Sequence, residues 1–147
     1  MPRSQKIKPF LWFDNNLEEA ITFYKTVFPE VEVHSINPMM GEFSIFGQEF
    51  LALNGGPQFP FTEAVSFFIT CADQKEIDYY WNALTEGGSE GRCGWLKDKF
   101  GLSWQVVPAE LGAHIGNPDP EKSAYAMNAM MQMNKFIIAD LYSDDLE

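Results

Sequence analysis

Basic side chains are scarce in this 147-residue chain, which has 10 Lys and Arg against 21 Asp and Glu and a net charge of −11. Nucleic-acid binding depends on clustered Lys and Arg that neutralise phosphates, and the sequence has no such cluster. We therefore expect no nucleic-acid partner. Four acidic residues lie close together near the C-terminus and predict a solvated tail: Asp140, Asp144, Asp145 and Glu147.

Cysteine is also rare, and long apolar runs are missing. The two cysteines, Cys71 and Cys93, cannot form a disulfide framework, and their apolar strand-like surroundings predict reduced structural thiols. No run of about 18 apolar residues is present, so we expect no membrane partner. The N-terminal stretch MPRSQKIKPF lacks the apolar region of a secretory signal, and a cytoplasmic location is the resulting expectation.

The length fits a single domain, residues 1–147, and the patterns along it favour a repeated arrangement. A strand is predicted over Ile7 to Phe13, then an amphipathic helix from Leu17 to about Phe28 with Asn16 as N-cap. Three strands follow at 31–36, 41–46 and 48–53.

The same order returns after a linker that contains Phe59 and Phe61. A strand over Ala64 to Cys71 precedes a helix from Gln74 to about Thr85, with Asp73 as N-cap. Short strands are predicted at 90–93, 95–97 and 102–107.

The two halves also correspond in detail, because the offset that carries Asn16 onto Asp73 carries Tyr24 onto Trp81. The predicted fold class is therefore α+β, with two βαβββ modules at about 7–54 and 64–108. Their apolar sheet faces would bury each other or curl into a cleft. A helical extension, 109–147, follows. Methionines at helical spacing in its 118–133 segment predict a core or subunit contact, with Ala124, Met127, Met130 and Met131 in the stripe.

Four stretches carry a family resemblance: FLALNGGPQFPF, SFFITCADQKEID, CGWLKDKFGLSWQVVP and PDPEKSAYAMNAMMQM. They resemble the PhnB-like branch of the glyoxalase/bleomycin-resistance/dioxygenase (vicinal oxygen chelate) superfamily, often labelled 3-demethylubiquinone-9 3-methyltransferase domain. The resemblance covers nearly the whole chain, although the connection from Asn37 to Met40 is shorter than usual in that branch. It implies paired modules that curl around a cleft, and a homodimer that can exchange elements between chains.

Metal-using members of that superfamily take ligands from the first and fourth strands of each module. The matching positions here are Pro9, about Ala52, about Ser66 and Gln105. Proline and alanine offer no side-chain donor, whereas a catalytic metal usually has three or four protein ligands, so we expect no metal. We expect His34 and His114 to be surface or structural residues, and Glu49 to be solvent-facing or structural.

Gln105 is the unusual residue, an amide within an apolar strand. Strand alternation puts Ser103, Gln105 and Val107 on one face and Trp104 and Val106 on the other. Gln105 either hydrogen-bonds an oxygenated ligand or pairs with Ser66 or a backbone group and only ties the modules together. The remaining candidate ligand-binding residues are Asn54 and the aromatic wall of Phe13, Phe50, Phe68 and Trp95.

The reaction, if any, stays open. No paired acid and base and no Ser-His-Asp or Cys-His arrangement is visible, and Asp98 is expected to form a turn. The chain also lacks a glycine-rich βα turn for a nucleotide-type cofactor, so we expect no cofactor. Two hypotheses follow. The first is a protein that binds a small organic molecule in a cleft between the modules without chemistry. The second is an active enzyme, either of the superfamily's lyase, dioxygenase or isomerase type or the methyltransferase that the family label suggests.

Overall fold

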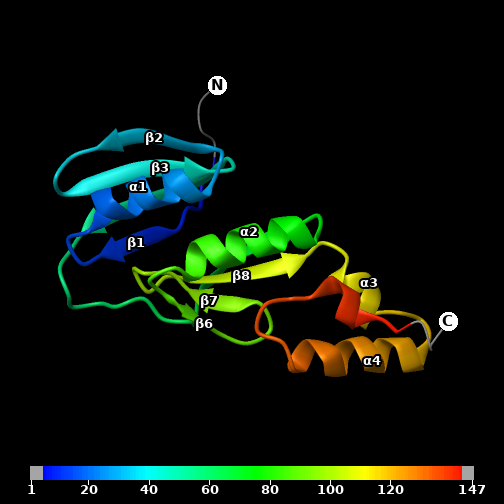
Figure 1. The fold of residues 1–147 in the computed structure, drawn as a ribbon. Coiled ribbons are helices and arrows are strands. Elements are labelled where there is room, and N and C mark those ends of the chain that lie inside the picture. The colour runs from blue at the N-terminus through cyan, green and yellow to red at the C-terminus, as the bar shows by residue number, and fades with distance from the viewer. Residues whose placement is uncertain (1–4, 144–147) are drawn as a thin grey trace. The chain divides into compact units, whose positions relative to one another are not determined.

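A computed structural model of the protein describes residues 5–143 (Figure 1). Asp144, Asp145 and Glu147 of the predicted acidic tail lie outside the described residues, and Asp140 is exposed. The chain divides into two compact units, one ending at Phe61 and the other beginning at Thr62. Each unit holds one four-stranded mixed sheet, as the repeated pattern predicts. None of the helices within residues 5–143 is long and apolar enough to cross a membrane.

The first unit has the order strand, helix and three strands. Its elements are β1 (Phe10–Phe13), α1 (Leu17–Val27), β2 (Val31–Ile36), β3 (Met40–Ile45) and β4 (Gln48–Asn54). The sheet order is β1-β4-β3-β2. β1 runs parallel to β4, and the other neighbouring strands are antiparallel. β1 is therefore an edge strand, next to the last strand of the β2–β3–β4 meander.

Helix α1 covers one face of this sheet (Figure 1). Its apolar residues recur at the helical period and bury one side, with Leu17, Ile21 and Tyr24 among the buried residues. On β3, a Cβ added to Gly41 would lie 3.1 Å from Leu17 Cδ2 and 3.7 Å from Ile21 Cδ1. Gly41 therefore marks the face beneath α1, and side chains an even number of residues away on β3 share that face.

The start of α1 differs from the prediction. Asn16 forms no side-chain cap, and its buried Oδ1 accepts no hydrogen bond from any described residue. The Leu17 N–H instead donates to Asn54 Oδ1 at 2.9 Å, and Asn54 Nδ2 donates to the Pro38 carbonyl at 3.0 Å. Asn54 thus joins the helix start to the end of β4 and to the β2–β3 turn. The local sequence had predicted Asn16 as the residue that caps the helix.

The second unit repeats the order with shorter strands. Its elements are β5 (Ser66–Cys71), α2 (Gln74–Thr85), β6 (Ser89–Glu90), β7 (Trp95–Lys97) and β8 (Ser103–Pro108). The sheet order is β5-β8-β7-β6, with β5 parallel to β8. The predicted Asp73 cap is confirmed, since its side chain accepts from the Glu76 N–H at 2.9 Å.

The predicted strand over residues 90–93 is wrong beyond Glu90. Cys93 and Gly94 have positive φ angles of 56° and 83°, and a left-handed turn of this kind cannot continue a strand. Asp98 shapes the next turn, as predicted. Its buried carboxylate accepts hydrogen bonds from the Phe100 N–H, the Leu102 N–H and the Trp104 indole N–H at 2.9, 3.1 and 2.9 Å.

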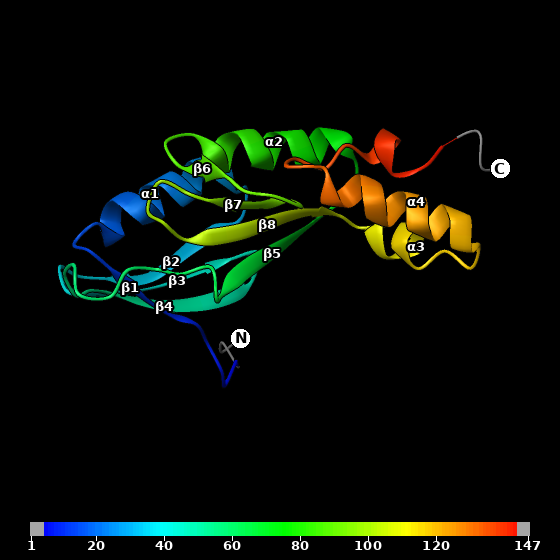
Figure 2. The ribbon, with the colours of Figure 1, turned by 90° about the horizontal axis from the view of Figure 1, so that it is seen from below.

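Three helical elements complete the second unit: α3 (Leu111–Ile115), α4 (Pro120–Met131) and the 3-10 turn η1 (Ile138–Leu141). Figure 2 shows α3 and α4 side by side, beyond the end of β8. Of the α4 residues only Ala126 is buried, and the side chains of Met127 and Met131 are 40% and 56% exposed. These two methionines of the predicted stripe therefore do not belong to the core of this chain.

The segment after α4 is bound firmly to α2. The side chain of Gln74 donates to the Phe136 carbonyl at 2.8 Å and accepts from the Ile138 N–H at 2.7 Å. Lys135 pairs with Asp78 at 2.8 Å, and this bond is the main reason that the pKa of Asp78 is lowered. The ring of Phe136 is buried against Gly94. The end of the described chain is thus part of the second unit.

Candidate functional site

Three side chains form a row across the second sheet. Gln105 on β8 pairs in register with Phe68 on β5 and with Trp95 on β7, and residues directly opposite in a sheet share a face. The other face carries Leu96, Trp104 and Val106, which are buried together with the apolar side of α2. The Phe68–Gln105–Trp95 row therefore lies on the face that α2 does not cover.

Only one end of the Gln105 amide forms a hydrogen bond. Its Nε2 donates to Ser66 Oγ at 3.0 Å, and both side chains are half-buried. This bond joins neighbouring strands of one sheet within the second unit, so it does not tie the two modules together. Within residues 5–143, no group donates a hydrogen bond to Gln105 Oε1. Phe68 is 59% exposed beside it. The arrangement offers one acceptor oxygen next to an apolar surface.

The candidate residues of the first unit lie elsewhere. Phe13 and Phe50 are 1% and 4% exposed, and Phe50 stacks on Phe43, with the ring centroids 5.2 Å apart. Phe43 is two residues from Gly41 on β3, which puts both paired rings under α1. Phe13 and Phe50 thus pack in the core of the first unit rather than on its open face. Asn54 is engaged at both ends of its amide by Leu17 and the Pro38 carbonyl.

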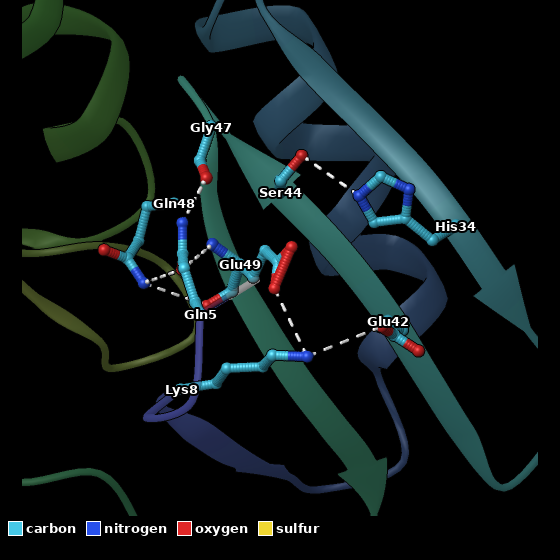
Figure 3. Close-up of polar contacts among 8 residues, drawn as sticks. All are labelled: Gln5, Lys8, His34, Glu42, Ser44, Gly47, Gln48 and Glu49. Atoms are coloured by element: carbon cyan, nitrogen blue, oxygen red, sulfur yellow. Dashed lines mark hydrogen bonds and ion pairs between the residues drawn. The ribbon is translucent and has the colours of Figure 1, made fainter. Parts of the chain in front are cut away.

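The open face of the first sheet carries a polar cluster that the sequence reasoning missed (Figure 3). The Lys8 ammonium lies 3.2 Å from Glu49 Oε1 and 4.0 Å from Glu42 Oε1. Glu49 is only 3% exposed, so it is structural rather than solvent-facing. Strand alternation put Glu49 on this face, but nothing in the local sequence indicated that Lys8, from the segment before β1, would neutralise it.

The two histidines lie in different units. His34, at a β-bulge in β2, has its Nε2 3.3 Å from Ser44 Oγ (Figure 3). His114 stacks on Tyr142, with ring centroids 5.8 Å apart, and its Nε2 lies 3.9 Å from Glu110 Oε1. Each histidine has a local protein contact, in line with the expected structural role.

The positions matched to metal ligands do not form a donor set. Ala52 is fully buried opposite Gly41, so the open face of β4 presents Leu51 and Leu53 instead, one residue to either side. Pro9 and these leucines have no side-chain donor, and Glu49 already binds an ammonium group. Among residues 5–143, no three His, Cys, Asp or Glu side chains gather in a group that could hold an ion. The residues present do not fit a divalent metal.

Two βαβββ units of this kind define a protein of the glyoxalase fold, and comparisons with known proteins agree. The family described as 3-demethylubiquinone-9 3-methyltransferase matches residues 5–107, and the chain belongs to this family. The chain is similar to a putative 3-demethylubiquinone-9 3-methyltransferase, PhnB protein, from Bacillus cereus. The two are 32% identical with a TM-score of 0.66, over 71% of this chain and 100% of that one.

Two further solved structures support the fold. Protein PA1353 from Pseudomonas aeruginosa is 24% identical with a TM-score of 0.58, over 71% of this chain and 98% of that one. The fosfomycin resistance protein FosX from Listeria monocytogenes, solved with Mn(II) and sulfate, is 14% identical with a TM-score of 0.55, over 73% and 93% of the two chains. No curated protein matches the chain.

Proposed function

We propose that this protein binds a small, oxygen-bearing organic molecule on the open face of its second sheet, without a catalytic metal. The observation that carries the proposal is the Phe68–Gln105–Trp95 row with Ser66 beside it. Small-molecule sites are mostly apolar with a few placed polar groups. Phe68 and Trp95 supply the apolar wall, Gln105 Oε1 accepts a hydrogen bond from a ligand hydroxyl or amine, and Ser66 Oγ can donate one to a ligand oxygen.

Binding without chemistry is favoured over catalysis by the side chains around the row. Gln105 and Ser66 do not titrate near neutral pH and cannot act as a general acid and base pair. The family name suggests methyl transfer, but such a reaction needs a methyl donor. The turns before α1 and α2, at residues 14–16 and 72–73, contain no glycine to let a nucleotide-type donor approach the backbone.

The proposal is tested first by a ligand screen. Oxygenated compounds are screened by thermal shift, since a ligand at 100 times its dissociation constant adds about 2.7 kcal/mol to stability. Removing one neutral hydrogen bond in Gln105→Ala should weaken binding of the hits by about two- to tenfold. Gln132→Ala is the matched control, because Gln132 is exposed at the end of α4. Hits that bind Gln105→Ala as well as the unaltered protein would refute the role of Gln105.

The metal part of the proposal has its own test. Protein purified without chelator should hold no divalent metal in stoichiometric amount, because the matched positions lack donors. Elemental analysis measures this directly. One tightly held Mn, Fe, Ni, Co or Zn per chain, lost together with ligand binding on chelation, would contradict the proposal.

We also propose a homodimer and a cytoplasmic location. The exposed side chains of Met127 and Met131 on α4 support a subunit contact, because methionine adapts to apolar partner surfaces. The free thiols of Cys71 and Cys93 fit a reducing compartment. Light scattering coupled to size exclusion should give the mass of a dimer, and the double substitution Met127→Glu with Met131→Glu should shift it to a monomer. A monomer before substitution would refute the dimer.

A further inference from the structure

A half-open groove of about 440 Å³ lies within the first unit, between α1 and β2. Its volume is within the range of small-ligand sites. The residues that α1 contributes are spaced three and four apart, so they form one stripe along the helix. The lining consists of Glu18, Ile21, Thr22 and Lys25 from α1, Val33 and Ile36 from β2, and Asn37 and Pro38 from the turn that follows.

The apolar wall that β2 contributes depends on the β-bulge at His34. Val33 pairs with Phe43 on β3, before the bulge, and beyond it Ile36 pairs with Gly41. Both of these β3 residues lie on the face beneath α1, so Val33 and Ile36 share that face although they are three residues apart. In a regular strand, residues three apart point to opposite faces. The extra residue of the bulge therefore directs both apolar side chains toward α1.

β2 is also an edge strand, because the sheet order β1-β4-β3-β2 leaves it with β3 as its only strand partner in the described chain. The Asn37 N–H donates to the Met40 carbonyl at 2.9 Å, so these residues extend the β2–β3 ladder as a hydrogen-bonded pair. Hydrogen-bonded and non-hydrogen-bonded pairs alternate along an antiparallel ladder. The backbone N–H and carbonyl of Ile36, the preceding residue, therefore point away from β3 and are available to an added strand.

The two ends of the groove carry opposite charges. Glu18 lies in the first turn of α1 and Lys25 in its last turn, seven residues apart, which is about 10 Å at 1.5 Å per residue. Neither side chain forms an ion pair with any group of the described chain. Glu18 marks the end next to Ile36, because Leu17 lies over the strand partner of Ile36. A ligand that complements both ends carries a cationic group and an anionic group at that spacing.

An extended peptide of three residues matches both features, since its length is about 10 Å at 3.3 Å per residue. We propose that this groove binds a free peptide of about three residues as an added strand at the edge of β2. The peptide ammonium contacts Glu18, the carboxylate contacts Lys25, and main-chain groups of the peptide pair with Ile36. Because β2 follows the end of α1 and runs back toward its start, this orientation makes the peptide antiparallel to β2. The inference goes beyond the proposed function, since it gives the first unit a ligand of its own.

The charge pattern is tested by isothermal titration calorimetry on the whole protein. The probes are Ala-Leu-Ala, whose leucine suits the apolar walls, its N-acetyl form and its C-terminal amide. Each blocked form should bind roughly two- to fivefold more weakly, as for a partly exposed ion pair. Glu18→Gln should weaken the free peptide by the same factor and leave the affinity of the acetyl form unchanged. Glu19→Gln is the matched control, because it removes an acid from the same turn of α1 but lies outside the groove, and it should change neither affinity.

The other end and the groove itself have their own variants. Lys25→Gln should weaken the free peptide but not the amide, whereas Lys75→Gln on α2 should weaken neither. Thr22→Trp puts a large side chain on the exposed lining and should abolish measurable binding, whereas Thr26→Trp, on the same helix outside the groove, should not. Methylation of both amide nitrogens of the peptide removes the donors for Ile36 and should also abolish binding.

Several outcomes would overturn the peptide site: no binding of Ala-Leu-Ala, equal affinities of the free and blocked peptides, unchanged binding of the methylated peptide, or equal losses in Glu18→Gln and Glu19→Gln. The proposed function fails or stands separately. Gln105→Ala should leave peptide binding unchanged, and a loss there would overturn this inference alone. Oxygenated hits from the ligand screen should bind Thr22→Trp as well as the unaltered protein, and their loss in that variant would count against the proposed function.

Discussion

Replacement of Gly94 by alanine should destabilise the second unit by breaking the contact between its sheet and the segment after α4. Gly94 has a φ of 83°, and a Cβ at this position would lie 2.6 Å from Phe136 Cε2 and 2.8 Å from the Val106 carbonyl oxygen. The backbone strain of a side chain in the left-handed region costs about 1–2 kcal/mol. The forced shift of a packed ring adds about 1–3 kcal/mol.

Gly101→Ala is the matched control for this prediction. Gly101 has a φ of 89°, but a Cβ there would meet nothing within 4 Å, so its replacement introduces the backbone strain alone. The difference between the two variants therefore isolates the clash. Urea unfolding followed by tryptophan fluorescence should give Gly94→Ala a free energy of unfolding about 1–3 kcal/mol below that of Gly101→Ala.

A double substitution identifies the atom responsible. Phe136→Leu replaces the ring that the new Cβ would meet with a smaller side chain. It should therefore recover part of the unfolding free energy that Gly94→Ala loses. Recovery is incomplete because the Val106 carbonyl belongs to the backbone of β8 and stays in place. Equal losses for Gly94→Ala and Gly101→Ala would refute the packing of Phe136 against Gly94.

Three further predictions concern single polar side chains. Asn54→Ala should lower the free energy of unfolding by about 1–2 kcal/mol, and Asn54→Asp by less, because aspartate still accepts from the Leu17 N–H; equal losses would contradict the helix-capping role. Asp98→Asn should cost about 1–3 kcal/mol by chemical denaturation, since an amide cannot accept all three hydrogen bonds; an unchanged midpoint would contradict this. Burial raises the pKa of Cys71 from 9.0 to about 12, so the folded state favours the neutral thiol, and the stability this contributes below pH 9 should fall as the pH rises toward 12. Cys71→Ala should flatten that fall, and an identical pH profile would refute it.

The sequence predicted the elements well wherever a pattern extended over several residues. The helices beginning at Leu17 and Gln74 and the strand from Val31 to Ile36 start where the periodicity placed them. β6 and η1 have only two and four residues, too few for a period, and local sequence did not define them. These short elements depend on contacts made by distant residues, such as the bond from the Ile138 N–H to Gln74.

The candidate site was predictable only in part, for a related reason. Alternation correctly grouped Gln105 with Ser103 and separated both from Trp104, and the structure brings Ser66, Phe68 and Trp95 to the same face. Alternation states which residues share a face but not which face a helix will cover. Phe13 and Phe50 were therefore assigned to the aromatic wall of the predicted cleft, although the packing of α1 buries them.

Within the segment after α4, the Gln74 side chain hydrogen-bonds only main-chain atoms, the Phe136 carbonyl and the Ile138 N–H. These two hydrogen bonds do not depend on the identity of the side chains after Phe136. They require only a backbone carbonyl at 136 and a backbone N–H at 138. The exposed Ala139 can thus be replaced, for instance to attach a fluorophore or an affinity handle, with these two hydrogen bonds left in place. Gln74 itself cannot be replaced by Glu in the same way. A carboxylate at this position would lack the N–H donor and would repel the Phe136 carbonyl.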